Sequence, residues 1–108
     1  MPKYLIQASY TAEGLKGLHK DKASGRREAI SHSIAALGGK LETMYYALGQ
    51  DDVVVIADLP DTASVAALCL AASGSGMVHT HTTALMTVEE TDQALKKSVD
   101  YRAPGSKH

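Results

Sequence analysis

The chain lacks two of the three large aromatic residues and has almost no cysteine. Its 108 residues contain no Trp, no Phe and one Cys, although 44% of them are hydrophobic. Because Cys69 stands alone, no intrachain disulfide can form, which fits a reducing compartment. A core without Trp or Phe is built from aliphatic side chains, Ala and Met. Such a core buries limited area per residue, so we expect extra burial through self-association.

Excess charge and long hydrophobic runs are also missing. Eleven Lys and Arg balance twelve Asp and Glu, so no broad electrostatic field favours nucleic acid or an anionic membrane. No run approaches the ~20 apolar residues that span a bilayer. The N-terminus enters a strand pattern at Lys3 without the apolar stretch of a signal peptide. We therefore expect a cytoplasmic protein that binds neither nucleic acid nor membrane.

Motifs that identify common enzyme classes are absent as well. The sequence has no nucleophile elbow, zinc-protease motif, dinucleotide fingerprint or paired-cysteine motif. Gly74-Ser75-Gly76 superficially resembles a phosphate loop, but it follows a predicted helix and lacks the Lys of a P-loop. The sequence leaves the cofactor unknown, and the case for an enzyme depends on pocket geometry alone.

The hydrophobic pattern predicts seven elements in one domain. Strand-like segments occupy residues 3–10, 40–48, 52–58 and 77–86, and helical patterns occupy residues 26–37, 61–73 and 87–98. Residues 11–21 contain too many glycines to predict a helix with the same strength. The order β-α-β-β-α-β with a short added helix predicts an α+β, ferredoxin-like domain with a four-stranded antiparallel sheet over residues 1–98. Residues 99–108 form a polar tail that we expect to be mobile.

One strand predicts how the domain assembles. Val53 to Ile56 are four consecutive β-branched apolar residues, which is typical of a strand covered on both faces. Two helices cover only one face of such a sheet. We therefore expect a second copy to cover the other face in a homodimer or a larger assembly of dimers.

Several short segments, taken in order, resemble the GYD domain family. They are Tyr4 with Tyr10-Thr11 and Gly14, Leu37-Gly38-Gly39-Lys40-Leu41, the hairpin from Leu48 to Val55, and Pro60-Asp61. The resemblance spans residues 3–98 and implies a domain of the dimeric α+β barrel kind. The chain departs from the family where Asp51 replaces the expected Tyr and Asp58 replaces a common Glu. The resemblance implies no catalytic residues.

His79 and His81 are the strongest candidates for chemistry. Residues two apart on a strand point to the same side, so their imidazoles could share a divalent metal or contact a ligand, or could be ordinary polar residues. A third metal ligand is missing from the local sequence, and no firm metal site is predicted. Side chains that could complete a ligand pocket lie on the first three strands. They are Gln7, Ser9, Tyr45 and Asp52, with Glu42 as a further possibility.

Three other groups favour structural roles. Asp51 and Asp58 lie beside a turn and a proline, where Asp serves the backbone, whereas Asp52 could border a pocket. Cys69 lies in an apolar helix stripe, which favours an inert thiol. The basic cluster on the first helix is either a solvated surface or the border of an anionic ligand. It consists of Lys20, Lys22, Arg26 and Arg27.

Three functions therefore remain open from the sequence. The first is a small-molecule binding or accessory protein with a cavity between subunit sheets. The second is an enzyme that uses that cavity, lined by His79 and His81. The third is an assembly module without a ligand.

Overall fold

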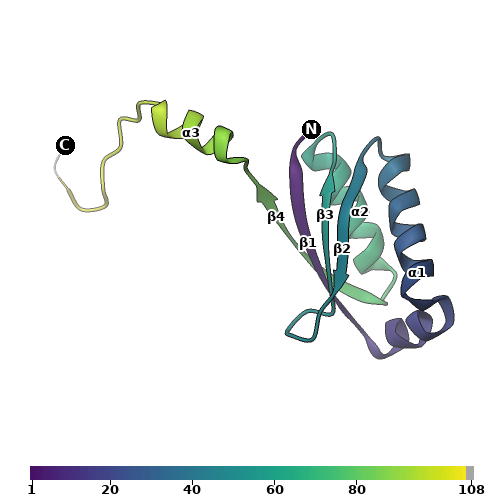
Figure 1. The fold of residues 1–108 in the computed structure, drawn as a ribbon. Coiled ribbons are helices and arrows are strands. Elements are labelled where there is room, and N and C mark those ends of the chain that lie inside the picture. Colours follow the sequence, from purple (N-terminus) through teal and green to yellow (C-terminus); the bar gives the residue numbers. More distant parts are fainter. Residues whose placement is uncertain (107–108) are drawn as a thin grey trace.

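The structure is a computed structural model, and it describes residues 1–106 (Figure 1). Along the chain it contains β1 (Lys3–Tyr10), α1 (Ala12–Ala36), β2 (Lys40–Tyr46), β3 (Val53–Asp58), α2 (Thr62–Gly74), β4 (Val78–Leu85) and α3 (Val88–Lys96). The four strands form one antiparallel sheet in the order β2-β3-β1-β4. The predicted α+β, ferredoxin-like order is confirmed.

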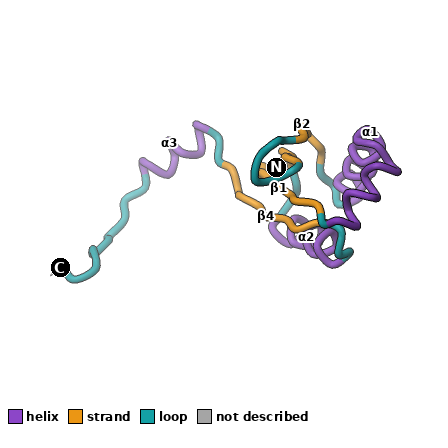
Figure 2. The backbone as a smooth tube through the Cα atoms, turned by 90° about the horizontal axis from the view of Figure 1, so that it is seen from below, coloured by secondary structure: helices purple, strands orange, loops and turns teal. Residues whose placement is uncertain are grey.

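The two longer helices lie on one side of the sheet, as both ribbon and tube show (Figures 1 and 2). The core lies between them and the sheet, where alternate residues of β1 and β3 point inward. These inward residues are Tyr4, Ile6, Ala8, Val53, Val55 and Ala57, and each is buried. Ile34 of α1 and Leu59 after β3 are fully buried against them. Aliphatic residues and Ala therefore make most of this core, with Tyr4 as its one buried aromatic residue.

The first helix is longer than its glycine content predicts. Instead of starting at Arg26, α1 starts at Ala12, because Thr11 caps it by accepting a hydrogen bond from the Gly14 amide at 3.1 Å. Gly14 is required at that position, since a Cβ there would lie 2.0 Å from the Met77 carbonyl oxygen. The contact with Met77 therefore outweighs the low helix propensity of glycine.

Lys22 divides this helix into two parts. It adopts φ 66° and ψ 162°, a conformation that side-chain-bearing residues rarely take. The chain before it, residues 12–21, turns away from the axis of the following helix. The sequence predicts that the helix starts at Arg26. The structure instead has a kink at Lys22 inside one longer helix.

The hairpin and the helix caps agree with the sequence pattern. β2 pairs with β3 in antiparallel register, although β2 ends at Tyr46 rather than at residue 48. The loop closes because the Ala47 amide donates to the Asp52 carbonyl oxygen at 2.8 Å. Asp61 caps α2 by accepting from the Ser64 amide at 2.8 Å. Thr87 and Glu90 form the capping box predicted for α3.

The C-terminal part of the chain leaves the body of the domain. Figures 1 and 2 show α3 apart from the sheet and from the other helices, and the described chain measures 59 × 30 × 24 Å. All nine residues of α3 are exposed. Residues 99–106 of the predicted tail form no regular helix or strand, and residues 107–108 lie outside the described part.

No helix within residues 1–106 combines the length and the hydrophobicity needed to cross a bilayer.

Candidate functional site

The side of the sheet opposite α1 and α2, which we call the open face, has no helix packed on it within residues 1–106. Pairing places Tyr45, Val54, Gln7 and His81 in one row across all four strands. The next row contains Thr43, Ile56, Leu5 and Thr83. The centre of the open face is therefore apolar, and its edges are polar.

A compact polar cluster occupies one corner of the open face. The Asp51 Oδ1 atom lies 2.8 Å from His81 Nε2 and accepts a hydrogen bond from Ser9 Oγ at 3.1 Å. Ser9 comes from β1, His81 from β4 and Asp51 from the β2–β3 loop, so three separate segments meet here. We call Ser9, Asp51 and His81 the polar corner.

The polar corner has an uneven exposure that suits binding. The side chain of Asp51 is only 12% exposed, whereas that of His81 is 66% exposed. The hydrogen bond from His81 and then that from Ser9 lower the pKa of Asp51, and partial desolvation opposes them. The Asp51 carboxylate is therefore fixed by two hydrogen bonds, and it orients the His81 imidazole, which is accessible to solvent.

The remaining predicted site residues divide between the open face and the backbone. Gln7 pairs with His81, and His79 pairs with Ser9, so both side chains belong to the open face. Tyr45 lies at the far edge of the same face and is 69% exposed. Asp52 differs, because its Oδ2 atom accepts from the Tyr10 amide at 2.8 Å and so extends the β1–β3 pairing. The structure brings Ser9 and His81 together, and it uses Asp52 to hold the end of the sheet.

A metal on His79 and His81 would need a further ligand. Across residues 1–106 the side chains of His, Cys, Asp and Glu nowhere gather in a group of three that could hold an ion. The nearby carboxylate, Asp51, contacts His81 and Ser9. His79 and His81 are therefore described as polar side chains of the open face.

A second charged group lies at the opposite end of the sheet. Lys3 Nζ donates to Asp58 Oδ1 at 2.9 Å and also contacts Glu42. The hydrogen bonds to Glu42 and Asp58 raise the pKa of Lys3. The ammonium is already paired with two carboxylates, so this group joins β1, β2 and β3.

Sequence reasoning missed Asp51 as a site residue and assigned it to the turn. It does lie in the loop, but its carboxylate crosses β1 to reach His81 of β4. The separation of 30 residues between these two side chains gives no local signal. Only the strand order β3-β1-β4 brings the loop beside β4.

The comparison with protein families gives one result. The model of the GYD domain matches residues 4–95 of the 108-residue chain. No curated protein and no solved structure matches it. The match includes β1, the hairpin and both long helices, and it extends through most of α3. The chain therefore belongs to the GYD domain family.

Proposed function

We propose that this protein is a cytoplasmic small-molecule binding or accessory protein that holds its ligand between the open faces of two copies. The observation that carries the proposal is the polar corner, in which Asp51 orients His81 beside an apolar sheet surface. A site of this composition holds the apolar part of a ligand on the sheet and its polar group at the corner.

The apolar part of the ligand would lie on the central strands. Leu5, Val54 and Ile56 point to the open face and remain partly exposed in a single chain. Burying them is favourable by about 25 cal/mol per Å² of apolar surface. A second copy would supply such cover, while a small molecule would fill the space left between the two sheets.

The polar part of the ligand would contact His81. Asp51 Oδ1 lies 2.8 Å from Nε2 of His81, so the other ring nitrogen, Nδ1, can donate to or accept from a bound group. Gln7, the strand neighbour of His81, offers both an amide donor and a carbonyl acceptor on the same face. The corner therefore suits a ligand with a hydroxyl, carbonyl or amide group.

The same His–Asp contact supports a second candidate function, an enzyme that uses the cavity. A carboxylate that orients an imidazole is the arrangement of many general bases. The Ser9 hydroxyl donates to the Asp51 carboxylate at 3.1 Å and not to the His81 imidazole. The contacts therefore favour proton transfer by His81 over nucleophilic attack by Ser9.

Native mass spectrometry of the protein purified from its own host tests the proposed function. We expect a dimer or a multiple of dimers that carries a retained small molecule. His81→Ala and Asp51→Asn should lose the added mass, while the exposed α1 variant His19→Ala should keep it. Assemblies without added mass in every variant would support an assembly module and contradict the proposal.

A further inference from the structure

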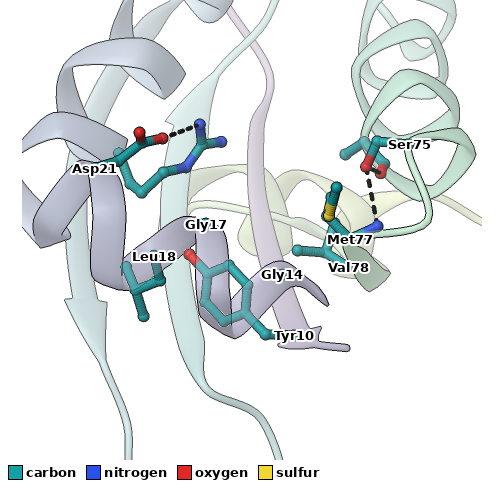
Figure 3. A pocket seen from close by; sticks show the side chains of 10 residues that line it. Tyr10, Gly14, Gly17, Leu18, Asp21, Ser75, Met77 and Val78 are labelled. Carbon is teal, nitrogen blue, oxygen red and sulfur yellow. Dashed lines mark hydrogen bonds and ion pairs between the residues drawn. The ribbon is translucent and has the colours of Figure 1, made fainter. Parts of the chain in front are cut away.

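The helix side of the sheet contains a second hollow, well away from the open face. A cavity of about 320 Å³ lies where β1 ends and β4 begins, between the first part of α1 and the end of α2 (Figure 3). Tyr10, Gly17, Leu18 and Ala72 contribute to its walls. Its volume is at the lower end of the range for small-molecule sites.

This cavity continues into a deeper apolar space under the helices. That space measures about 100 Å³, and Tyr10, Arg26, Ala72 and Val78 line both hollows. Ile6, Ile30, Leu68 and Cys69 line only the deeper one. Because they share four lining residues, we treat the two spaces as one cleft. Its lining is mostly apolar, and its outer part also contains Asp21, Arg26 and Ser75.

Two of the residues that line the outer part of the cleft, Gly17 and Ala72, are small. Gly17 has no side chain and Ala72 has one methyl group, so neither reaches across the space between α1 and α2. The chain contains no Trp or Phe that could fill it. A close-packed interior normally leaves few voids larger than a water molecule.

The mouth of the cleft contains one loosely paired cation, Arg26. Arg26 lies there with its guanidinium 3.6 Å from Asp21, a loose ion pair drawn as the dashed line at Asp21 (Figure 3). A charge-assisted hydrogen bond at full strength is closer to 2.8 Å, so Arg26 keeps donors for another acceptor. Lys20, Lys22 and Arg27 are near in sequence and exposed, as is Glu28, but none of these four side chains lines the cleft.

Backbone features fix the position of this mouth. Thr11 donates from its amide to the Met77 carbonyl oxygen at 2.8 Å and from Oγ1 to that of Gly76 at 2.9 Å. The kink at Lys22 separates the part of α1 that bears Gly17 and Leu18 from the part that bears Arg26, and all three residues line the cleft. Strain of this kind is often found at ligand sites.

We propose that this cleft binds an amphipathic monoanion, a carboxylate with a short apolar tail. The carboxylate contacts Arg26 at the mouth, and the tail lies between Ile30, Leu68 and Ala72. The Tyr10 hydroxyl lies 3.3 Å from the Tyr46 hydroxyl, and it can donate to the carboxylate when Tyr46 is the donor in that pair. This site is separate from the open face and does not depend on the proposed function.

Binding of octanoate, measured by isothermal titration calorimetry, tests the proposal. Arg26→Gln should weaken binding about 10-fold to 100-fold, because it removes a charge-assisted hydrogen bond. Arg27→Gln is the matched control. It removes the same charge from the next residue along the chain, and the Arg27 side chain does not line the cleft. Hexanoate should bind more weakly than octanoate by about fourfold per missing methylene.

Two further measurements locate the ligand. Cys69 is the single cysteine and lines the deeper space, so octanoate should slow its alkylation by a maleimide in proportion to occupancy. Ala72→Leu should fill the cleft and abolish both the heat and the protection. Asp21→Asn should strengthen binding, because it removes the carboxylate that competes for Arg26.

Three results would overturn the proposal. One is equal affinity for octanoate and octylamine, and another is an equal loss in Arg26→Gln and Arg27→Gln. The third is the absence of saturable binding up to millimolar octanoate. His81→Ala should leave octanoate affinity unchanged, so failure of this site and failure of the open-face site are distinguishable.

Discussion

At the scale of single residues, Asp51 shows how a loop side chain acquires a role far from its sequence neighbours. Its carboxylate is mostly buried and accepts from Ser9 and contacts His81, which belong to two adjacent strands. These contacts hold the carboxylate in its charged form. Its sequence position, two residues after Gly49 in a hairpin loop, indicates only a turn.

The lowered pKa of Asp51 predicts a specific acid titration. The folded-state pKa lies below the ordinary value of 3.8, so the contribution of Asp51 to stability is complete above that value. It is lost as the pH falls through the lower folded pKa, where the carboxylate becomes protonated. We expect carbon NMR of the Asp51 carboxyl to show a midpoint below 3.8 in the wild type and a higher one in His81→Ala. An unchanged midpoint in the variant would contradict the contact.

Gly39 predicts a second residue-level effect. A Cβ at this position would lie 2.3 Å from the Asp58 carbonyl oxygen and 2.9 Å from Leu59 Cδ2. Gly39→Ala should therefore cost about 1–3 kcal/mol in the free energy of unfolding, as overpacking does. Gly49→Ala is the control, because a Cβ there has no atom within 4 Å. Urea denaturation measures both, and equal midpoints would show that the Gly39 contact is absent.

At the scale of elements, α3 differs from α1 and α2 because its stability comes from local signals. Both long helices contribute residues to the core, Ile34 and Val65, whereas all nine residues of α3 are exposed. A helix of this length is marginal in water without packing. Its capping box is therefore a large part of what holds it.

Thr87→Ala tests this dependence. Losing the cap should destabilise α3 by about 1 kcal/mol, enough to fray a helix without tertiary contacts. The body of the domain should keep its melting temperature, since α3 lies apart from it. Amide hydrogen exchange of residues 88–96 measures the fraying, and circular dichroism measures the melting. A lower melting temperature of the body would show that α3 packs on it or on a second copy.

At the scale of the whole molecule, the two sides of the sheet are unequal. One side is buried under α1 and α2, and the other carries Leu5, Val54 and Ile56 without a covering helix among residues 1–106. A chain of 11.4 kDa is small, and small domains bury a smaller fraction of their surface than large ones do. We propose that a second copy covers the open face and so adds the layer that one chain lacks.

Ile56→Asp tests whether a second copy covers the open face. We expect the wild type to sediment as a dimer or a multiple of dimers at micromolar concentration, and the variant to dissociate or lose stability. The reason is that an unpaired charge in a covered sheet face costs several kcal/mol. Thr83→Asp, at the outer edge of the same row, should be milder. A wild-type mass of 11.4 kDa, unchanged by Ile56→Asp, would show that the open face stays in contact with water.

The sequence alone determined the order of the elements, the sheet and most of the caps. Those features depend on periodicity and on side-chain to backbone contacts within four residues, as in Asp61 with Ser64 and Thr87 with Glu90. It also indicated that His79 and His81 share one side of their strand and that Gln7 and Ser9 share one side of theirs, because alternate strand residues share a face. The pairing of β1 with β4 places both sides on the same face.

Only the tertiary structure decided the rest. The helix over residues 12–21 forms because Gly14 fits against Met77, a contact between segments more than 60 residues apart. Asp51 meets His81 because β1 lies between β3 and β4. The cleft with Arg26 at its mouth depends on how far apart α1 and α2 lie. Each of these features joins distant parts of the chain, and local patterns carry no information about which distant segments become neighbours.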